Sequence, residues 1–418
     1  MINKTILRRR LIEQDEYKKK ILTKPLIERE LSINLKHILE TPLIKAIIGP
    51  RRAGKTTLGL MILQNHDFYY LNFDDDLLSM IKQNDLNQIL EVLIETFGKK
   101  HYILLDEIQN IKGWEFFVNR LQRLEYNVII TGSNSKLLSK ELSSHLGGRV
   151  ITIEILPFSF KEFLKVKNFD LNLKETEENV GLIKNLLLDY LKIGGFPEIL
   201  INQFSDELIK SYHKEIFRTI IERDLVTRFR IRFPTELKAL GNVLMNYFSS
   251  RISLRKLSKE FGISVHTIKK YINYFEEAYL FLLSKKFSYK PKISELSIRK
   301  IFSIDNGLVN SLGLNFSENL GRLMENLVAI ELKRRNYELF YYLTRSNKEV
   351  DFVVKDNGIQ IMQVVNDMDG IPEREIKSGV EACKELGCKK LLIVTWDYEA
   401  NEDGIKFIPL WKWLLGKE

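Results

Sequence analysis

The sequence predicts an α/β fold, followed by a mostly helical region and a second α/β region. Short apolar runs occur at residues 46–48, 68–73, 102–105 and 127–131, and helical stretches separate them, which is the alternation typical of a sheet covered by helices. A glycine-rich turn follows the first run directly. The chain has 418 residues, of which 44% are hydrophobic, and this indicates about three domains that each bury a core.

The glycine-rich turn carries the strongest functional signal. A glycine, four further residues and then Gly54-Lys55-Thr56 form the complete Walker A pattern. Glycines let the backbone curl so that successive amides point at phosphate oxygens, and the next helix adds its positive end. We therefore expect ATP and Mg²⁺ as ligands, with Lys55 on the β- and γ-phosphates and Thr56 on the metal. The residues expected to bind the cofactor are Gly49, Pro50, Arg51, Arg52, Ala53, Gly54, Lys55, Thr56 and Thr57.

Two acids, Asp106 and Glu107, end the apolar run at residues 102–105. After a complete Walker A, this is the Walker B pattern, in which Asp106 holds Mg²⁺ through water and Glu107 polarises the attacking water. The run at residues 127–131 also ends in small polar residues. Ser133 and Asn134 fit a sensor of the γ-phosphate, and ordinary turn chemistry fits them equally well.

Arg149 follows two glycines and precedes a strand expected at residues 151–155. An arginine projected from the domain at this point can complete a neighbour's ATP site as an arginine finger, and the protein would then be a homo-oligomer. A plain surface arginine is the simpler interpretation of the same pattern.

Composition limits the remaining classes of protein. There are 64 Lys and Arg against 55 Asp and Glu, and this net charge of +9 permits a polyanionic partner. Sparse cysteine and the lack of a signal-peptide pattern favour the cytoplasm. No apolar run reaches the roughly 18 residues of a membrane helix, so no membrane partner is expected. Residues 1–30 are highly charged and are expected to form a helical, partly solvated arm.

Residues 235–300 carry a helix-turn-helix pattern followed by a possible wing. A tight turn at residues 261–264, with Ser264 as N-cap, separates two amphipathic helices. The exposed positions of the second helix fit contacts to DNA. These positions are His266, Thr267, Lys269 and Lys270. A packing or protein-interaction module is the alternative, and the added charge of Lys285 and Lys286 favours DNA slightly.

Together these motifs resemble a known family. The runs GPRRAGKTT, ILLDEIQ, ITGSNS, LGGR and ILPFSFKEF, and the later GGFPE, SIDNG and KEVDF, are similar to archaeal and bacterial AAA-type P-loop ATPases. In that family the ATPase core is fused to a carboxy-terminal domain of unknown function with a restriction-endonuclease-like fold. The resemblance supports the roles of Arg149 as finger and Ser133 as sensor. The expected domains are a charged arm (1–30), an AAA-type core (31–155), a helical lid (156–234), a winged helix-turn-helix (235–300) and a nuclease-like domain (301–418).

The carboxy-terminal region departs from an active nuclease. Enzymes of that fold hold a metal with an Asp on one strand and a Glu or Asp on the next, followed two residues later by a Lys. Asp351 stands in the first position and Glu325 offers a further carboxylate, but Gln363 and Val365 replace the second acid and the lysine. An amide is a weaker Mg²⁺ ligand than a carboxylate and cannot act as a base. We therefore expect a nuclease-like fold without nuclease activity.

The expected function is that of an AAA-type ATPase that couples its nucleotide state to the binding of DNA or a partner protein. Two alternatives stay open: an ATP-gated DNA-binding regulator with negligible turnover, and an ATP-dependent nuclease. The rate of ATP turnover with and without duplex DNA separates the first alternative from the expected function.

Overall fold

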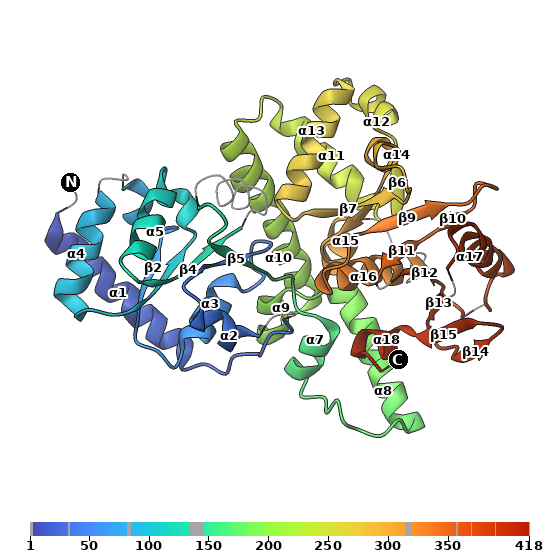
Figure 1. The fold of residues 1–418 in the computed structure, drawn as a ribbon, viewed down its shortest axis with the longest axis horizontal. Helices are drawn as coiled ribbons and strands as arrows, with labels where there is room; N and C mark the ends of the chain where they lie inside the picture. Colours follow the sequence, from blue (N-terminus) through green and yellow to red (C-terminus); the bar gives the residue numbers. More distant parts are fainter. Residues whose placement is uncertain are drawn as a thin grey trace. The chain divides into compact units, whose positions relative to one another are not determined.

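Two compact units make up the chain in the computed structural model, Met1–Leu156 and Pro157–Glu418 (Figure 1). The structure describes residues 3–31, 34–81, 85–133, 146–313, 320–356, 358–368, 370–388 and 390–417. The predicted Walker A turn lies in the first unit, and the helix-turn-helix pattern lies in the second.

Five parallel strands form the sheet of the first unit. Their order in space is β2-β3-β4-β1-β5, and every neighbouring pair is parallel. The strands are β1 (Ile44–Ile48), β2 (Phe68–Asn72), β3 (Tyr102–Asp106), β4 (Asn127–Gly132) and β5 (Val150–Glu154). All residues of β1 and β4 are buried, as expected for a parallel sheet with helices on both faces. The predicted α/β fold with a parallel core sheet is confirmed.

Helices cover both faces of this sheet, and alternate strand residues point to different cores. Ile103 and Leu105 of β3 pack into one core, while Leu104 between them packs into the other. α4 (Leu86–Phe97) and α5 (Trp114–Arg123) close the first core, and α2 (Leu35–Glu40) and α3 (Lys55–Leu63) close the second. Two short 3₁₀ turns, η1 (Leu78–Met80) and η3 (Ile108–Asn110), follow β2 and β3.

The amino-terminal helix α1 (Lys4–Leu22) is partly exposed and packs against the first unit through one face. Leu7 and Leu11 are buried in the first core. The Gln14 side chain accepts from the amide of Asn72 at 2.9 Å and donates to its carbonyl at 3.2 Å. Because an edge strand has unpaired peptide groups, this amide side chain acts as a partner for β2. The helix therefore belongs to the first unit and covers an edge of its sheet.

Helices dominate the first part of the second unit. Ser159 and Glu162 form a capping box at the start of the first helix, and Ser205 caps the fourth. The helices are α7 (Phe160–Val166), α8 (Glu177–Ile193), α9 (Pro197–Asn202), α10 (Asp206–Thr219), the π-helix η4 (Ile220–Thr227) and α11 (Pro234–Asn246).

The predicted helix-turn-helix consists of α12 (Leu254–Phe261) and α13 (Val265–Glu277). Gly262 adopts a left-handed φ of 65° in the turn, and Ser264 accepts from the amide of Thr267 at 3.1 Å, so the predicted cap is confirmed. The flanking strands and helix are β6 (Ser250–Ile252), β7 (Phe281–Lys286), α14 (Pro291–Leu296) and β8 (Arg299–Ser303).

The sheet containing these strands continues into the carboxy-terminal region. Its order is β10-β9-β7-β8-β6, in which β9 (Phe340–Leu343) pairs in parallel with β7 and β10 (Glu349–Val350) forms the other edge. The boundary expected at residue 300 therefore divides β8 and also divides one hydrogen-bonded sheet. Strand pairing thus joins residues on the two sides of the expected boundary.

A second mixed sheet completes the unit, in the order β11-β12-β13-β15-β14. β12, β13 and β15 run parallel, and α17 packs against β12 and β13 (Figure 1). The strands are β11 (Phe352–Lys355), β12 (Ile359–Val364), β13 (Lys390–Thr395), β14 (Ala400–Glu402) and β15 (Ile405–Pro409). The helices are α15 (Asn306–Leu312), α16 (Leu320–Arg334), α17 (Glu373–Leu386) and α18 (Leu410–Leu415).

Candidate nucleotide-binding site

Strand order brings the ends of β1, β3 and β4 together at one edge of the first sheet. β4 lies between the other two, with Ile48 of β1 opposite Gly132 and Leu105 of β3 opposite Ile130. The turn after β1, the acids at the end of β3 and the polar end of β4 are therefore neighbours. The carboxyl ends of parallel strands are where α/β sheets bind ligands.

Two glycines permit the path of the turn between β1 and α3. Gly49 has a φ of 150°, and a Cβ atom there would lie 2.0 Å from the carbonyl oxygen of Ile155. Gly54 has a left-handed φ of 93° directly before α3. Residues with a Cβ atom are disfavoured in both of these backbone conformations, so the loop depends on glycine at its two ends. The loop leads into the amino-terminal end of α3, whose first amides have no partner within the helix.

Arg29, which the sequence analysis did not select, holds this loop. Its guanidinium donates to the carbonyl oxygen of Ala53 at 2.8 Å and to that of Leu156 at 2.6 Å. One planar group therefore links the nucleotide loop to the segment that follows β5. A single arginine in a highly charged stretch gives no signal of such a role.

Lys55 is buried beneath the loop, with 4% of its surface exposed. Its ammonium donates to the carbonyl oxygens of Gly49 at 3.2 Å and Pro50 at 2.9 Å. The Glu107 carboxylate lies 3.8 Å away. A positive charge held in a poorly solvated position attracts an incoming anion more strongly than a solvated one does.

Asp106 is the centre of a buried hydrogen-bond network. Both of its carboxylate oxygens accept from the Thr56 hydroxyl at 2.9 Å, and the hydroxyls of Tyr70 and Thr131 also donate to it. Burial, with a smaller contribution from the charge of Glu107, raises the pKa of Asp106 to about 6, and the hydrogen bonds from Thr131 and Thr56 oppose that rise. A bound cation would favour the ionised form of this carboxyl.

Glu107 follows in a left-handed conformation, with a φ of 52°. Its amide donates to the Thr131 hydroxyl at 3.0 Å, and the Gln109 amide donates to its carboxylate. A left-handed φ is uncommon for a residue with a side chain, and residues held this way are frequent at functional sites. The arrangement fits the expected role of Glu107 beside the phosphate-binding loop.

The polar end of β4 contributes to the site through a residue that the sequence analysis did not select. Thr131 joins Asp106 and the Glu107 amide, as described above. Ser133 is buried two residues later, and Asn134 lies outside the described residues. Side chains alternate along a strand, so the small polar run of residues 131–133 offered a signal for Thr131 as well as for Ser133.

Arg149 lies at the amino-terminal ends of the strands, whereas this network lies at their carboxyl ends. Val150, at the start of β5, pairs with Ile44 at the start of β1, whereas the loop follows the end of β1. The carbonyl of Arg149 accepts from Ile44 at 2.9 Å, and its side chain is exposed. A strand of this length spans roughly 16 Å. Arg149 is therefore placed away from the nucleotide loop of its own chain.

The donor set at this edge fits Mg²⁺ and a phosphorylated ligand. Thr56 and Asp106 present hydroxyl and carboxylate oxygens 2.9 Å apart, which are the ligand types that Mg²⁺ prefers. The loop between Gly49 and Gly54 leads to the amino-terminal end of α3, and Lys55 supplies a positive charge below the loop. Mg²⁺ bound here would neutralise charge on phosphate oxygens.

A second group of charges is buried in the carboxy-terminal unit. The Lys300 ammonium of β8 contacts Glu325 at 2.6 Å, Glu349 at 2.7 Å and Asp351 at 3.1 Å. Burial lowers the pKa of Lys300, but the charges of Glu325, Asp351 and Glu349 outweigh it, and the pKa is raised overall. Gln363 accepts from the Asp351 amide at 2.8 Å. The two residues that sequence analysis compared with nuclease ligands are thus close together, with a lysine among the acids.

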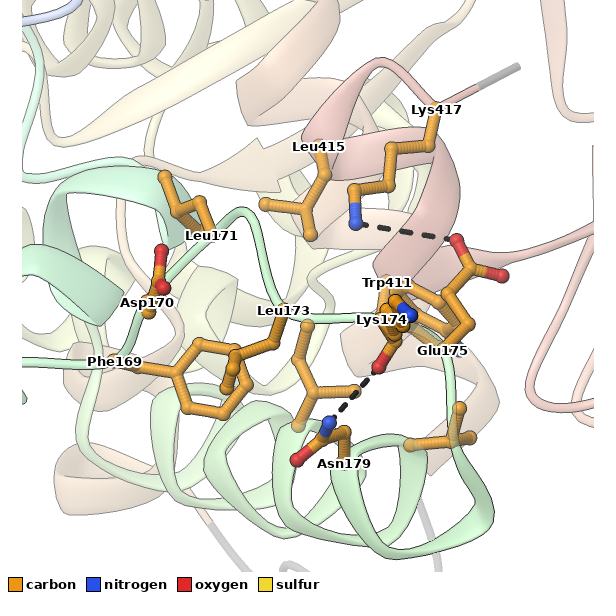
Figure 2. Close-up of a pocket in the computed structure, with 12 residues that line it drawn as sticks. Phe169, Asp170, Leu171, Leu173, Lys174, Glu175, Asn179, Trp411, Leu415 and Lys417 are labelled. Atoms are coloured by element: carbon orange, nitrogen blue, oxygen red, sulfur yellow. Dashed lines mark hydrogen bonds and ion pairs between the residues drawn. The ribbon is translucent and has the colours of Figure 1, made fainter.

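The cavity in Figure 2 is too small for a cofactor. It encloses about 20 Å³ between the segment before α8 and the helix α18. Trp411 and Leu415 face Phe169 across it, and Asn179 donates to the Lys174 carbonyl at 2.9 Å (Figure 2). A single water needs roughly 10–15 Å³, so this space holds about one water molecule. It is a packing gap.

The parallel sheet, the loop after β1 and the Thr56–Asp106 pair define a P-loop ATPase domain of the AAA type. A family profile described as "AAA domain" matches residues 41–164. Two profiles described as domains of unknown function match residues 184–320 and 320–413.

Relatives extend this likeness over most of the chain. "Uncharacterized protein MJ1544" of Methanocaldococcus jannaschii is 41% identical over 396 residues, which cover 89% of this chain and 88% of that protein. A protein of Haemophilus influenzae is 34% identical over 418 residues, covering 94% of this chain and 100% of that one. The chain belongs to the same family as these two proteins.

One solved structure aligns with this chain at low sequence identity and low structural similarity. It is the signal transduction ATPase with numerous domains (STAND) protein with a tetratricopeptide repeat sensor from Pyrococcus horikoshii. The identity is 16%, the TM-score is 0.27, and the alignment covers 73% of this chain and 46% of that chain.

Within the described residues, no helix combines the length and the hydropathy that crossing a membrane requires.

Proposed function

We propose that this chain binds Mg²⁺·ATP at the loop of residues 49–57 and hydrolyses it. The observation that supports this most directly is the pairing of Thr56 with Asp106 at 2.9 Å beside the buried Lys55. The start of α3 and the end of β3 thus supply the metal ligands and the phosphate-binding charge of the Walker motifs. Thr56 and Asp106 would hold Mg²⁺, directly or through water, and Lys55 would bind the β- and γ-phosphates.

Glu107 is proposed to orient and polarise the attacking water. Its backbone amide is held by Thr131, and its carboxylate lies beside Lys55. Ser133 and Asn134 stay candidates for a γ-phosphate sensor. The remaining loop residues, from Gly49 to Ala53 together with Gly54 and Thr57, would surround the phosphates with backbone groups.

Two variants test this proposal. Lys55→Ala should weaken the binding of a fluorescent ATP analogue and remove phosphate release. Glu107→Gln should retain nucleotide binding while slowing hydrolysis by roughly 10²- to 10⁴-fold, because it removes only the group that acts on water. Hydrolysis by Lys55→Ala at the wild-type rate would contradict the assignment. Equal losses of affinity and rate in Glu107→Gln would contradict the role of that residue.

Arg149 is proposed to act on the ATP site of a second copy of the chain. Its exposure and its location at the start of β5 support action in trans over action in cis. Arg149→Ala mixed with Lys55→Ala should regain some hydrolysis, because a mixed interface pairs an intact loop with an intact arginine. If assembly is confirmed and no ratio restores activity, Arg149 is a surface residue.

The segment from α11 to β8 is proposed to be a winged helix that binds DNA. Two antiparallel pairings, β7 with β8 and β8 with β6, flank the α12–α13 pair in the chain. His266, Lys269 and Lys270 are exposed on α13. Binding of labelled duplex DNA at several salt concentrations tests this, because phosphate contacts make affinity fall steeply with salt. ATP turnover that stays negligible with and without duplex DNA would favour the ATP-gated DNA-binding regulator over the hydrolysing ATPase.

The carboxy-terminal α/β region is proposed to be nuclease-like but inactive. Gln363 offers an amide where an acid would be needed, and it donates to Glu375 at 3.0 Å and to Ser378 at 2.8 Å. The Lys300 ammonium already forms an ion pair with Asp351 at 3.1 Å. Incubation with Mg²⁺ or Mn²⁺, ATP and linear, circular and branched DNA should produce no cleavage. Strand scission that disappears in Asp351→Ala would establish an ATP-dependent nuclease instead.

A further inference from the structure

The segment between η4 and α11 alternates arginine with large apolar residues. Residues 228–233 read Arg-Phe-Arg-Ile-Arg-Phe and are called the arginine segment below. The region from residue 223 to residue 277 holds eleven Lys and Arg against five Asp and Glu, which is most of the net charge of +9. Positive charge concentrated in one stretch is the electrostatic pattern of a polyanion-binding surface.

Aromatic contacts fasten the arginine segment to the side of α13. Phe229 stacks on Tyr274 of α13, with ring centroids 3.8 Å apart and an angle of 14° between the rings. The Lys270 ammonium lies 5.7 Å from the centroid of the same Tyr274 ring. Lys270, Tyr274 and Phe229 therefore form one continuous group, and Arg230 follows Phe229 directly in the chain.

The basic side chains around this group are exposed to solvent, where a ligand can reach them. Arg230 and Arg232 are exposed on the segment, and Lys269 and Lys270 are exposed on α13. Among the residues that the structure describes, none of these four has a carboxylate within ion-pair distance. Arg218 of α10 differs, because Glu215 and Glu222 bind it at 2.7 and 3.0 Å.

We infer that the arginine segment is a second DNA-contacting element, which binds the phosphate backbone beside the site of α13. This inference rests on the DNA binding proposed for α13 and extends it to residues outside the helix-turn-helix. Guanidinium groups bind phosphate oxygens through two parallel hydrogen bonds, which suits Arg230 and Arg232 to this role. Phosphate contacts position a protein on DNA without reading its sequence, so the segment contributes affinity and not sequence preference.

The salt dependence of binding by the full-length protein measures the contribution directly. Each phosphate contact adds about 0.9 to the slope of log affinity against log salt for duplex DNA. Arg230→Ala/Arg232→Ala should lower that slope by about 2 on a labelled 20-bp duplex, equally for two unrelated sequences. The same chain with Arg230→Lys/Arg232→Lys should keep most of the slope, because the charges remain.

The matched control removes two exposed cations that already have carboxylate partners. Arg218→Ala/Lys377→Ala has the same change in net charge, and Lys377 pairs with Glu373 at 2.9 Å. The slope of this control should stay within about 0.5 of wild type. A control that loses as much slope as the arginine variant would show a general charge effect and overturn the inference.

Further outcomes separate this inference from the proposed function. A slope that changes in Lys269→Ala/Lys270→Ala but not in the arginine variant would overturn the inference and leave DNA binding by α13 intact. Heparin binding that matches duplex binding in strength and in variant response would assign the surface to polyanions in general and overturn it too. No duplex binding by wild type at low salt would overturn both DNA proposals, while ATP hydrolysis by the same sample would preserve the ATPase.

Discussion

Replacing Asp106 with asparagine is expected to stabilise the nucleotide-free protein and to remove hydrolysis. Asp106 is 2% exposed, and burial raises its pKa to about 6 from an ordinary value of 3.8. Each tenfold change in the acid constant corresponds to about 1.4 kcal/mol, so the ionised carboxylate costs the fold about 3 kcal/mol at pH 7.5. Asparagine has nearly the same shape, carries no charge and keeps one oxygen for the Thr56 or Thr131 hydroxyl.

The pH dependence of this effect has a defined sign. A carboxyl whose pKa is higher in the folded state binds its proton more tightly there, so its contribution to stability falls as pH rises. For Asp106 that fall takes place between about pH 4 and pH 6 and is complete above pH 6. Asparagine does not titrate. The stability difference between variant and wild type should therefore grow over this interval and then stay constant.

Thermal unfolding without nucleotide or Mg²⁺, from pH 4.5 to pH 8, measures this difference. A change of 1 kcal/mol shifts Tm by roughly 2–4 °C for a unit of this size, so Asp106→Asn should unfold several degrees above wild type at pH 7.5. Mg²⁺ with ATP should raise the wild-type Tm more than that of the variant. Asp403→Asn, an exposed site in the turn between β14 and β15, is the control and should change neither.

The outcome that would refute this reasoning is a Tm of Asp106→Asn below that of wild type at pH 7.5. The three hydroxyl groups that donate to Asp106 would then stabilise the fold by more than its burial destabilises it. A Tm difference between Asp106→Asn and wild type that stays constant from pH 4.5 to pH 8 would point to better packing and not to the removed charge.

Three further predictions follow from the contacts of single residues. Arg29→Ala should weaken ATP binding several-fold with little loss of Tm, because the Ala53 carbonyl of the loop loses its hydrogen bond. Titration with a fluorescent ATP analogue measures this, and an unchanged affinity would contradict the prediction. Gly49→Ala should abolish ATP binding, since its Cβ would meet the Ile155 carbonyl, and wild-type binding by folded protein would disprove the clash. Lys300→Met should destabilise the second unit by about 3–5 kcal/mol, because buried carboxylates lose their cation. Denaturant unfolding measures this, and adding Glu325→Gln should restore part of the loss.

Local patterns in the sequence determine the nucleotide loop and the strands around it. The Walker A turn depends on glycines and on a lysine and threonine at fixed spacing, so residues 49–57 are recognisable without any distant contact. The same holds for Asp106 and Glu107, which directly follow an apolar run. Continuous apolar strands separated by helices also predict the parallel sheet, because a strand covered on both faces needs no polar side.

The remaining features depend on contacts between residues far apart in the chain. The Gln14 side chain hydrogen-bonds with the backbone of the edge strand β2, and Arg29 donates to a carbonyl 127 residues away. Neither residue differs in type from its charged and polar neighbours in the sequence. The strand pairing of β5 places Arg149 away from its own loop. Lys300 contacts Glu325 of α16 and Glu349 of β10, across the boundary expected at residue 300. Hydrogen bonds and ion pairs between distant segments leave no periodicity in the sequence, so they become visible only once strand order brings those segments together.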